Sequence, residues 1–365
     1  MTASSSVSAT LPPRSRDATF ATGSSSLSRR SKQHQLDTVN ATTSSQEAQT
    51  RRRRKRFTNA DAEAVYRLSK GRWCPGYDDE DLSLKVKDAL NIIEQAVDRY
   101  GLEHLALSFN GGKDCTVLVH LLAAVALRKA ATSKLSSQTS LQLPRLKSVY
   151  VRCLSPFPQV EHFVNACTET YNLDLMAVEG GMKEALQEYL DKVGRNSMQK
   201  NLSTTNGNES KQVEAILVGT RRNDPHGAQL TPFDPTDKGW PNFMRVHPIL
   251  DWSYKQIWDF LRHPMLTIGD ENQSGDQDDV GTIEWCELYD YGYTSLGSTH
   301  NTFPNPLLRT EDEVGLVGGW RPAWDLQDGS QERAGRERLA DRVLQKQQAI
   351  GDNGKAESGG GNATI

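Results

Sequence analysis

The sequence predicts an α/β fold in which helices cover both faces of a parallel sheet. Short apolar runs of strand length alternate with longer segments whose apolar residues recur at helical spacing. Chains with this pattern usually form parallel sheets joined by right-handed crossovers. A polar turn with two glycines also separates an apolar run at 105–109 from a longer one that begins at once. The length of 365 residues allows one large domain or two small ones.

The expected elements follow one another in a regular order. A first helix is expected over 82–100, where every third or fourth residue is apolar: Leu82, Val86, Leu90, Ile93 and Val97. The other expected elements are strands at 105–109, 146–154, 173–178 and 214–220 and helices at 113–130, 159–171, 182–193 and 253–262, the last with Ser253 as its N-cap. Polar stretches at 131–145 and 194–211 are expected to be surface insertions, and 269–281 to be an acidic loop.

Both ends of the chain lack apolar periodicity. Residues 1–56 are rich in Ser and Thr and end in a basic run, and residues 339–365 have low complexity. Such segments bury too little apolar surface to fold, so we expect disordered tails on either side of one domain at 57–338. The first tail is a plain solvated segment, a mitochondrial or nuclear signal, or a patch for polyanions. Unless the tail directs it elsewhere, we expect a cytoplasmic protein.

Charge, cysteines and hydropathy argue against several classes of protein. The net charge of -3 gives no overall attraction to nucleic acid or to a membrane. Five cysteines, an odd number without a Cys-x-x-Cys pair, argue against a disulfide framework or a zinc site. The apolar run at 117–127 is interrupted by His120 and is shorter than the roughly 18 residues of a membrane span. We expect a monomer without a membrane span or a specific nucleic-acid partner.

The polar turn, Ser108-Phe109-Asn110-Gly111-Gly112-Lys113-Asp114, has the composition of a phosphate-binding loop. Free backbone N–H groups and the positive end of a helix dipole meet where a strand leads into a helix. The glycines would let phosphate oxygens approach, Lys113 would add a mobile charge, and Asp114 would help to hold Mg²⁺. A glycine turn with a solvated lysine is the alternative. The loop is not Walker A, because Leu107 stands where that motif has its first glycine.

A second polar motif, Val-Gly-Thr-Arg-Arg-Asn-Asp-Pro at 218–225, follows the fourth expected strand. Gly219 would allow close approach of a ligand, and Arg221 and Arg222 would neutralise phosphates unless one of them is a surface residue. Five prolines between 225 and 248 predict an ordered loop. Within it, Trp240 and Phe243 are candidates to cover a flat ring or to be core aromatics, and for Phe243 the core is favoured.

The first motif resembles the PP-loop of the adenine nucleotide α-hydrolase-like enzymes, which is usually written SGGxDS. It departs from that pattern at Phe109-Asn110 and at Cys115, and "FNGGKD" in this form resembles the eukaryotic monofunctional FAD synthases, which are related to PAPS reductases. Three further segments, at 215–262, 289–308 and 320–336, resemble signatures of the same family in the expected order. The resemblance covers about 85–338. It implies a three-layer Rossmann-like parallel sheet with a carboxyl-terminal extension.

The resemblance also implies roles for individual residues. The implied catalytic residues are Asn110, Asp224, Asp237, Arg333 and Arg336. The implied ATP contacts are Ser108, Phe109, Asn110, Gly111, Gly112, Lys113, Asp114, Gly219 and Arg221. The implied FMN contacts are Arg222, Asp224, Pro225, Asp237, Trp240 and Arg245, with Asp114 as the metal ligand. Judged without the family, Arg333 and Arg336 would be a solvated helical face at three-residue spacing.

The implied reaction is transfer of AMP from ATP to FMN, with Mg²⁺ as cofactor and no strong general base. Client apo-flavoproteins are potential protein partners. Three rival functions stay open at this point: a PAPS-reductase-like thiol enzyme, a tRNA-modifying enzyme that adenylates a base, and a non-enzymatic binding module. The first needs a reactive cysteine near the carboxyl terminus, but Cys286 has no histidine two or three places on. The second needs a basic aromatic surface within the folded part.

Overall fold

The computed structural model describes residues 56–71, 80–133, 142–201, 212–266, 283–310 and 319–336. All of them belong to one compact unit, 54–365. The expected tails, most of the insertion at 131–145, the end of the insertion at 194–211 and the acidic loop at 269–281 lie outside the described residues.

A six-stranded sheet organises this unit, in the order β3-β2-β1-β4-β6-β5. Its strands are β1 (Leu105–Ser108), β2 (Leu146–Arg152), β3 (Leu173–Glu179), β4 (Ala215–Leu217), β5 (Phe233–Pro235) and β6 (Met244–Val246). The pairs among β3, β2, β1, β4 and β6 are parallel, as predicted. The sheet departs from the predicted parallel arrangement at one edge, where β5 pairs antiparallel with β6. These two strands arise within the proline-rich segment that we expected to be a loop.

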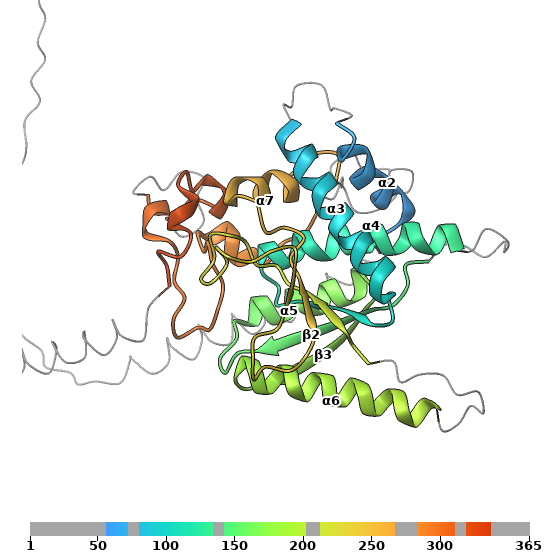
Figure 1. Ribbon diagram of the computed structural model, residues 1–365. Coiled ribbons are helices and arrows are strands. Elements are labelled where there is room, and N and C mark those ends of the chain that lie inside the picture. The colour runs from blue at the N-terminus through green and yellow to red at the C-terminus, as the bar shows by residue number, and fades with distance from the viewer. Residues whose placement is uncertain are drawn as a thin grey trace, which may run out of the picture. The chain divides into compact units, whose positions relative to one another are not determined.

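Helices cover both faces of the sheet, as the alternating pattern predicts. They are α2 (Asn59–Leu68), α3 (Glu80–Tyr100), α4 (Lys113–Ser133), α5 (Pro158–Thr170), α6 (Met182–Asn201) and α7 (Tyr254–Leu261). Figure 1 shows α6 below the sheet and α2, α3 and α4 above it. Short 3-10 helices follow: η1 (Glu287–Tyr291), η2 (Pro306–Leu308), η3 (Ala323–Asp325) and η4 (Gly329–Gln331).

The sheet divides the core into two clusters because neighbouring strand residues point to opposite faces. Leu105 and Leu107 of β1 join the larger cluster with α2 to α5 and α7, whereas Ala106 joins the smaller cluster with α6. The larger cluster makes α4 a central helix. By length and hydropathy α4 could cross a membrane, but 72% of the relevant window is buried inside the protein, and its His120 is buried against Phe57. Its apolar character is that of a core helix.

Local signals account for most of the element boundaries. Ser253 caps α7 as expected, by accepting from Gln256 N–H in a capping box. A second capping box at Thr58 and Asp61 begins α2, a helix that was not predicted from the sequence. The helix expected at 182–193 is longer than predicted, because α6 continues to Asn201 through the first part of the polar insertion.

Candidate functional site

Gly111 and Asn110 shape the turn between β1 and α4. Gly111 has a φ of +73°, and a Cβ atom there would lie 3.0 Å from Val164 Cγ2, so both conformation and space require glycine. The side-chain oxygen of Asn110 accepts a hydrogen bond from Gly112 N–H at 2.9 Å. Because this bond uses the oxygen, the two N–H bonds of the exposed Asn110 amide are left for a ligand.

The amino terminus of α4 contacts Tyr289 of η1. Lys113 N–H donates to the Tyr289 hydroxyl at 2.8 Å, so this N–H, which we had expected to face phosphate, already has a side-chain acceptor. Burial, reinforced by the negative charge of Asp114, raises the pKa of Tyr289 well above its ordinary value. The hydroxyl therefore keeps its proton at neutral pH. Since its oxygen accepts from Lys113, that proton is available to a further acceptor.

The turn after β4 is held by Asp224. Its carboxylate accepts from Arg221 N–H at 2.8 Å, and its carbonyl accepts from Gly227 N–H at 2.9 Å. Gly219 lines the cavity described below and also has a role in packing. A Cβ atom at Gly219 would lie 3.3 Å from the backbone of Asp114 and Cys115. The glycine therefore lets the chain that follows β4 pack against the start of α4.

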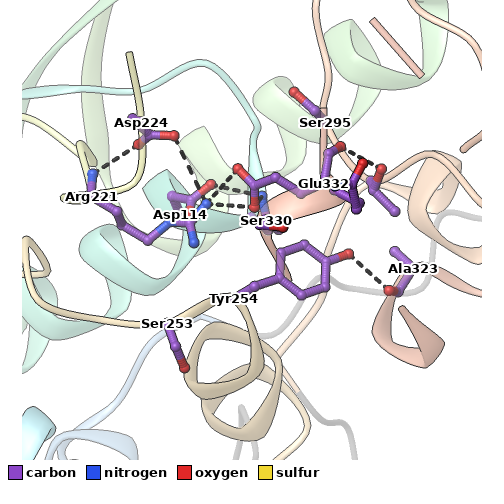
Figure 2. A network of polar contacts seen from close by, with 12 residues as sticks. Asp114, Arg221, Asp224, Ser253, Tyr254, Ser295, Ala323, Ser330 and Glu332 are labelled. Atoms are coloured by element: carbon purple, nitrogen blue, oxygen red, sulfur yellow. Dashed lines mark hydrogen bonds and ion pairs between the residues drawn. The ribbon is translucent and has the colours of Figure 1, made fainter. Parts of the chain in front are cut away.

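A buried network of ion pairs joins the two motifs to the carboxyl-terminal segment (Figure 2). Arg221 Nε lies 2.7 Å from Asp114 Oδ1, and its Nη2 lies 2.6 Å from both carboxylate oxygens of Glu332. Lys113 Nζ lies 3.0 Å from Asp114 Oδ2 and 3.4 Å from Glu332 Oε2. The side chains of Lys113 and Arg221 are only 3% and 2% exposed. Arg221 Nη2 also lies 3.9 Å from Asp224 Oδ1, so two buried cations face three carboxylates.

The network corrects the role expected of Lys113. We had expected a mobile charge that reaches for phosphate, but Lys113 is buried, paired with Asp114 and Glu332, and 5.2 Å from the centre of the Tyr254 ring. Arg221, expected to contact ATP, is held in the same way. The carboxylates raise the pKa of Arg221 even though burial opposes its charge. The positive charges of Lys113 and Arg221 are thus balanced by carboxylates of the protein itself.

Asp114 does not fit the expected part of metal ligand. One carboxylate oxygen faces Arg221 and the other faces Lys113, so neither is turned to a cation from solution. Burial alone would raise the pKa of Asp114, but Lys113 and Arg221 outweigh burial and lower it. Among the described residues there is also no group of three or more His, Cys, Asp or Glu side chains placed to hold a metal ion.

A cavity of about 450 Å³ opens at the carboxyl edge of the sheet. Nine residues expected at the site line it: Ser108, Asn110, Gly112, Lys113, Asp114, Gly219, Asp224, Pro225 and Arg333. Two others lie beneath the loop, since Phe109 is fully buried and Gly111 packs against α5. The lining also includes Tyr150, Val151, Val160 and the segment 295–297. The structure therefore brings the two sequence motifs and the carboxyl-terminal arginine to one hollow.

Two arginines of the carboxyl-terminal segment, Arg333 and Arg336, have no ion pair among the described residues, and only Arg333 of the two lines the cavity. Arg333 is exposed, lines the cavity, and has no ion pair within the described part of the chain. Arg336 donates to the Leu296 carbonyl at 2.6 Å and lies 3.4 Å from Ser295 Oγ. Burial and the nearby charge of Arg333 lower the pKa of Arg336. Both arginines lie in a turn that follows η4, so they do not form the solvated helical face that was the alternative.

The other residues expected to contact FMN lie outside the cavity lining. Arg222 turns away, with Nε 2.5 Å from Asp251 and Nη1 bonded to the carbonyls of residues 228 and 230. Asp237, Trp240 and Arg245 lie together around the β5–β6 hairpin, where Arg245 Nη1 is 3.4 Å from the Asp237 carboxylate. Trp240 is 40% exposed. Phe243 is buried in the smaller core cluster, as the favoured interpretation predicted.

Glu332 and Tyr289 belong to the site but are not among the residues predicted from the sequence. Glu332 directly precedes Arg333, but an isolated glutamate beside arginines gives no sign that it is buried. Its 111-residue separation from Arg221 puts the contact beyond any local pattern. Tyr289 is one of three tyrosines in the stretch 289–293, and nothing in the sequence distinguishes it from the other two.

Comparison with known proteins first defines a class. The phosphoadenosine phosphosulfate reductase domain family matches residues 104–269, which include both motifs. The fold is similar to that of Candida glabrata FMN adenylyltransferase in complex with FMN and an ATP analogue, with a TM-score of 0.56 and 23% identity over 78% of this chain and 99% of that chain. The chain thus has a PP-loop type nucleotide-binding fold.

The relatives then define the family. A probable FAD synthase of Schizosaccharomyces pombe is 40% identical over 255 residues, which are 70% of this chain and 80% of that protein. The flavin adenine dinucleotide synthase of Saccharomyces cerevisiae is 30% identical over 57% of this chain and 60% of that protein. This chain belongs to the FAD synthase family. It spans only 45% of a third relative, a probable FAD synthase of Caenorhabditis briggsae.

Proposed function

We propose that this protein transfers AMP from ATP to FMN and so makes FAD and pyrophosphate. A phosphate oxygen of FMN attacks the α-phosphorus of ATP, the bond to the bridging oxygen of the β-phosphate breaks, and pyrophosphate leaves. The observation that carries the proposal is the meeting of the Asn110 amide, the start of α4 and Arg333 at one cavity in a member of the FAD synthase family. The relatives with that name match at higher identity than the phosphoadenosine 5'-phosphosulfate reductases, such as that of Xylella fastidiosa at 24%.

Catalysis by this chain would depend on position and charge. The attacking phosphate has a second pKa of about 6 and is already anionic at neutral pH, so a strong base is not needed. The Asn110 amide N–H groups would donate hydrogen bonds to the α-phosphoryl oxygens. The Tyr289 hydroxyl would donate a hydrogen bond to a neighbouring phosphate oxygen and keep its proton. Arg333 and Arg336 would neutralise the charge that develops on the phosphates. The buried network around Lys113 would hold the loop in place.

In the proposed reaction, Mg²⁺ enters the site bound to the phosphates of ATP. Magnesium bound with nucleotides keeps several waters and is often held largely by the phosphates. Because both oxygens of Asp114 face cations of the protein, we assign no residue of this chain as a direct ligand, and no step of the reaction is derived from the metal. It would supply positive charge to the phosphates of ATP.

The flavin would extend from the cavity toward the β5–β6 hairpin. Met182 at the start of α6 lines the cavity and is 54% exposed. The next residue, Lys183, reaches the hairpin, since its Nζ lies 3.9 Å from where a Cβ atom of Gly239 would be. The exposed ring of Trp240 is next to that glycine and would cover the flat isoalloxazine, with Asp237 and Arg245 beside it.

The direct test is incubation of the purified full chain with FMN, ATP and Mg²⁺, followed by chromatography of the flavins. We expect FAD to appear in step with an equal amount of pyrophosphate. Riboflavin in place of FMN should give no product, since the attacking phosphate would be missing. If FMN is recovered unchanged at every time point, the proposed function is wrong.

The rival thiol chemistry makes an opposite prediction for Cys286. This thiol is buried, and burial raises its pKa to about 11, so it is protonated at neutral pH. We expect Cys286→Ala to keep FAD formation within about threefold of the unmodified protein, because the thiol lies in the core and not in the cavity. The same rate measurement on Cys167→Ala, a second buried thiol, is the control for lost packing. Abolished activity in Cys286→Ala alone would favour the thiol enzyme.

A further inference from the structure

Glu332 links the buried ion-pair network to the carboxyl-terminal side of the cavity. It is 7% exposed and receives Arg221 and Lys113, which come from two different turns at the edge of the sheet. Both carboxylate oxygens lie 2.6 Å from Arg221 Nη2. Among the ion pairs of the described residues, Glu332 is the one residue of the carboxyl-terminal segment 319–336 that pairs with Lys113 and Arg221.

Hydrogen bonds also fix the backbone on both sides of Glu332. Thr294 Oγ1 donates to the Glu332 carbonyl at 2.6 Å, and Asn305 Nδ2 donates to the Gln331 carbonyl at 2.8 Å. Thr294 and Asn305 are themselves buried and bonded to each other at 3.0 Å. The position of the chain immediately before Arg333 is therefore set by buried contacts and not by the arginine itself.

Arg333 follows Glu332 directly and behaves in the opposite way. Its side chain is exposed at the cavity and, within the described residues, has neither an ion pair nor a side-chain hydrogen bond to hold it. A long arginine side chain without partners gains its direction mainly from the placement of its backbone. The backbone of Arg333 is placed by two sets of contacts of Glu332: its carboxylate with Lys113 and Arg221, and its carbonyl with Thr294.

We propose that Glu332 is a positioning residue, which holds Arg333 at the reacting phosphates by anchoring its segment to Lys113 and Arg221. The proposal rests on the proposed function. In this proposal Lys113 and Arg221 do not bind phosphate directly but hold the segment that carries Arg333. In this arrangement a change in the nucleotide-binding loop is transmitted to Arg333 through one carboxylate.

The competing explanation is that Glu332 only stabilises the fold. A buried carboxylate that faces two cations is expected to matter for stability in either case, because its loss leaves uncompensated charge. Activity of Glu332→Gln alone therefore cannot decide between the two. A double-mutant cycle with Arg333→Gln can, since a positioning residue loses its effect on turnover once the group that it positions has been removed.

The experiment measures kcat and KM for ATP in four proteins: unmodified, Glu332→Gln, Arg333→Gln and the double variant. Each rate is divided by the folded fraction obtained from circular dichroism. We expect Glu332→Gln to lower kcat at least about twentyfold with KM for ATP within about threefold, and to lower it by less than about twofold when Arg333 is already replaced. Glu284→Gln, a change at an exposed glutamate outside the cavity, should match the unmodified protein.

If the two losses multiply in the double variant, Glu332 does not act through Arg333 and the inference is wrong. If Glu332→Gln does not fold, Glu332→Asp replaces it in the cycle, because it keeps the buried negative charge but draws the carboxylate back from Lys113 and Arg221 by one methylene. Multiplying losses would overturn the inference there too. An unmodified protein that makes no FAD would overturn the proposed function and the inference with it, whereas FAD formation with multiplying losses overturns the inference alone.

Discussion

Replacement of Asn110 by alanine is expected to lower turnover by at least about a hundredfold while ATP affinity stays within a few-fold, as is typical when a transition-state donor is lost. The amide oxygen is already used by Gly112 N–H, so its two N–H bonds are directed to the phosphoryl group that gains charge during transfer. Those bonds matter more in the transition state than in the bound substrate, which is why kcat and not affinity should fall. Single-turnover FAD formation and equilibrium ATP binding measure the two quantities separately.

Asn110→Asp separates this role from the shaping of the loop. Aspartate keeps an oxygen that can accept from Gly112 N–H, but it replaces the donors with a second, negatively charged oxygen. We expect it to be at least as slow as the alanine variant. If Asn110→Asp keeps most of the activity, the residue serves only the loop, and if Asn110→Ala turns over nearly normally, it has no catalytic part.

The fold could be predicted from the sequence where local patterns determine it. The apolar stripe from Leu82 to Val97 and the capping signal at Ser253 are short-range features, and both were confirmed. The antiparallel strand β5 was missed because its three residues end in Pro235 and lack an apolar run. Its place is determined by pairing with β6, which a local pattern does not contain.

The candidate site could be predicted as a set of residues but not as an arrangement of charges. The loop at Asn110 and the turn at Asp224 each follow an expected strand, and both line the cavity at the carboxyl edge of the sheet. Which cations are free was not predictable, because it depends on Glu332, a long-range partner. The motif lysine is consequently balanced, whereas Arg333 faces the cavity, as the family resemblance implied and as its local spacing alone did not indicate.

Arg221→Met is expected to lower the free energy of unfolding by about 3 to 5 kcal/mol, the usual cost of removing one partner from a buried ion pair. Methionine fills similar space but leaves Asp114 and Glu332 with Lys113 as their only cation. Urea unfolding followed by circular dichroism measures the loss. Arg222→Met is the matched control: its pair with Asp251 is exposed to solvent, so only a small fraction of that loss is expected. Equal losses at the two positions would contradict a buried, interdependent network.

The pH dependence of the free energy of unfolding tests the same ion-pair network through the protonation of Asp114. Lys113 and Arg221 outweigh burial and lower the pKa of Asp114 below its ordinary value of 3.8, so the folded state binds fewer protons than the unfolded state in acid. The stabilisation from Asp114 is therefore complete above about pH 5 and is lost as the pH falls through 3.8 and below. Without Arg221, burial has less opposition and the pKa of Asp114 rises. We expect the acid-dependent part of the unfolding free energy to shrink in Arg221→Met, whereas Arg222→Met, remote from Asp114, keeps the slope of the unmodified protein.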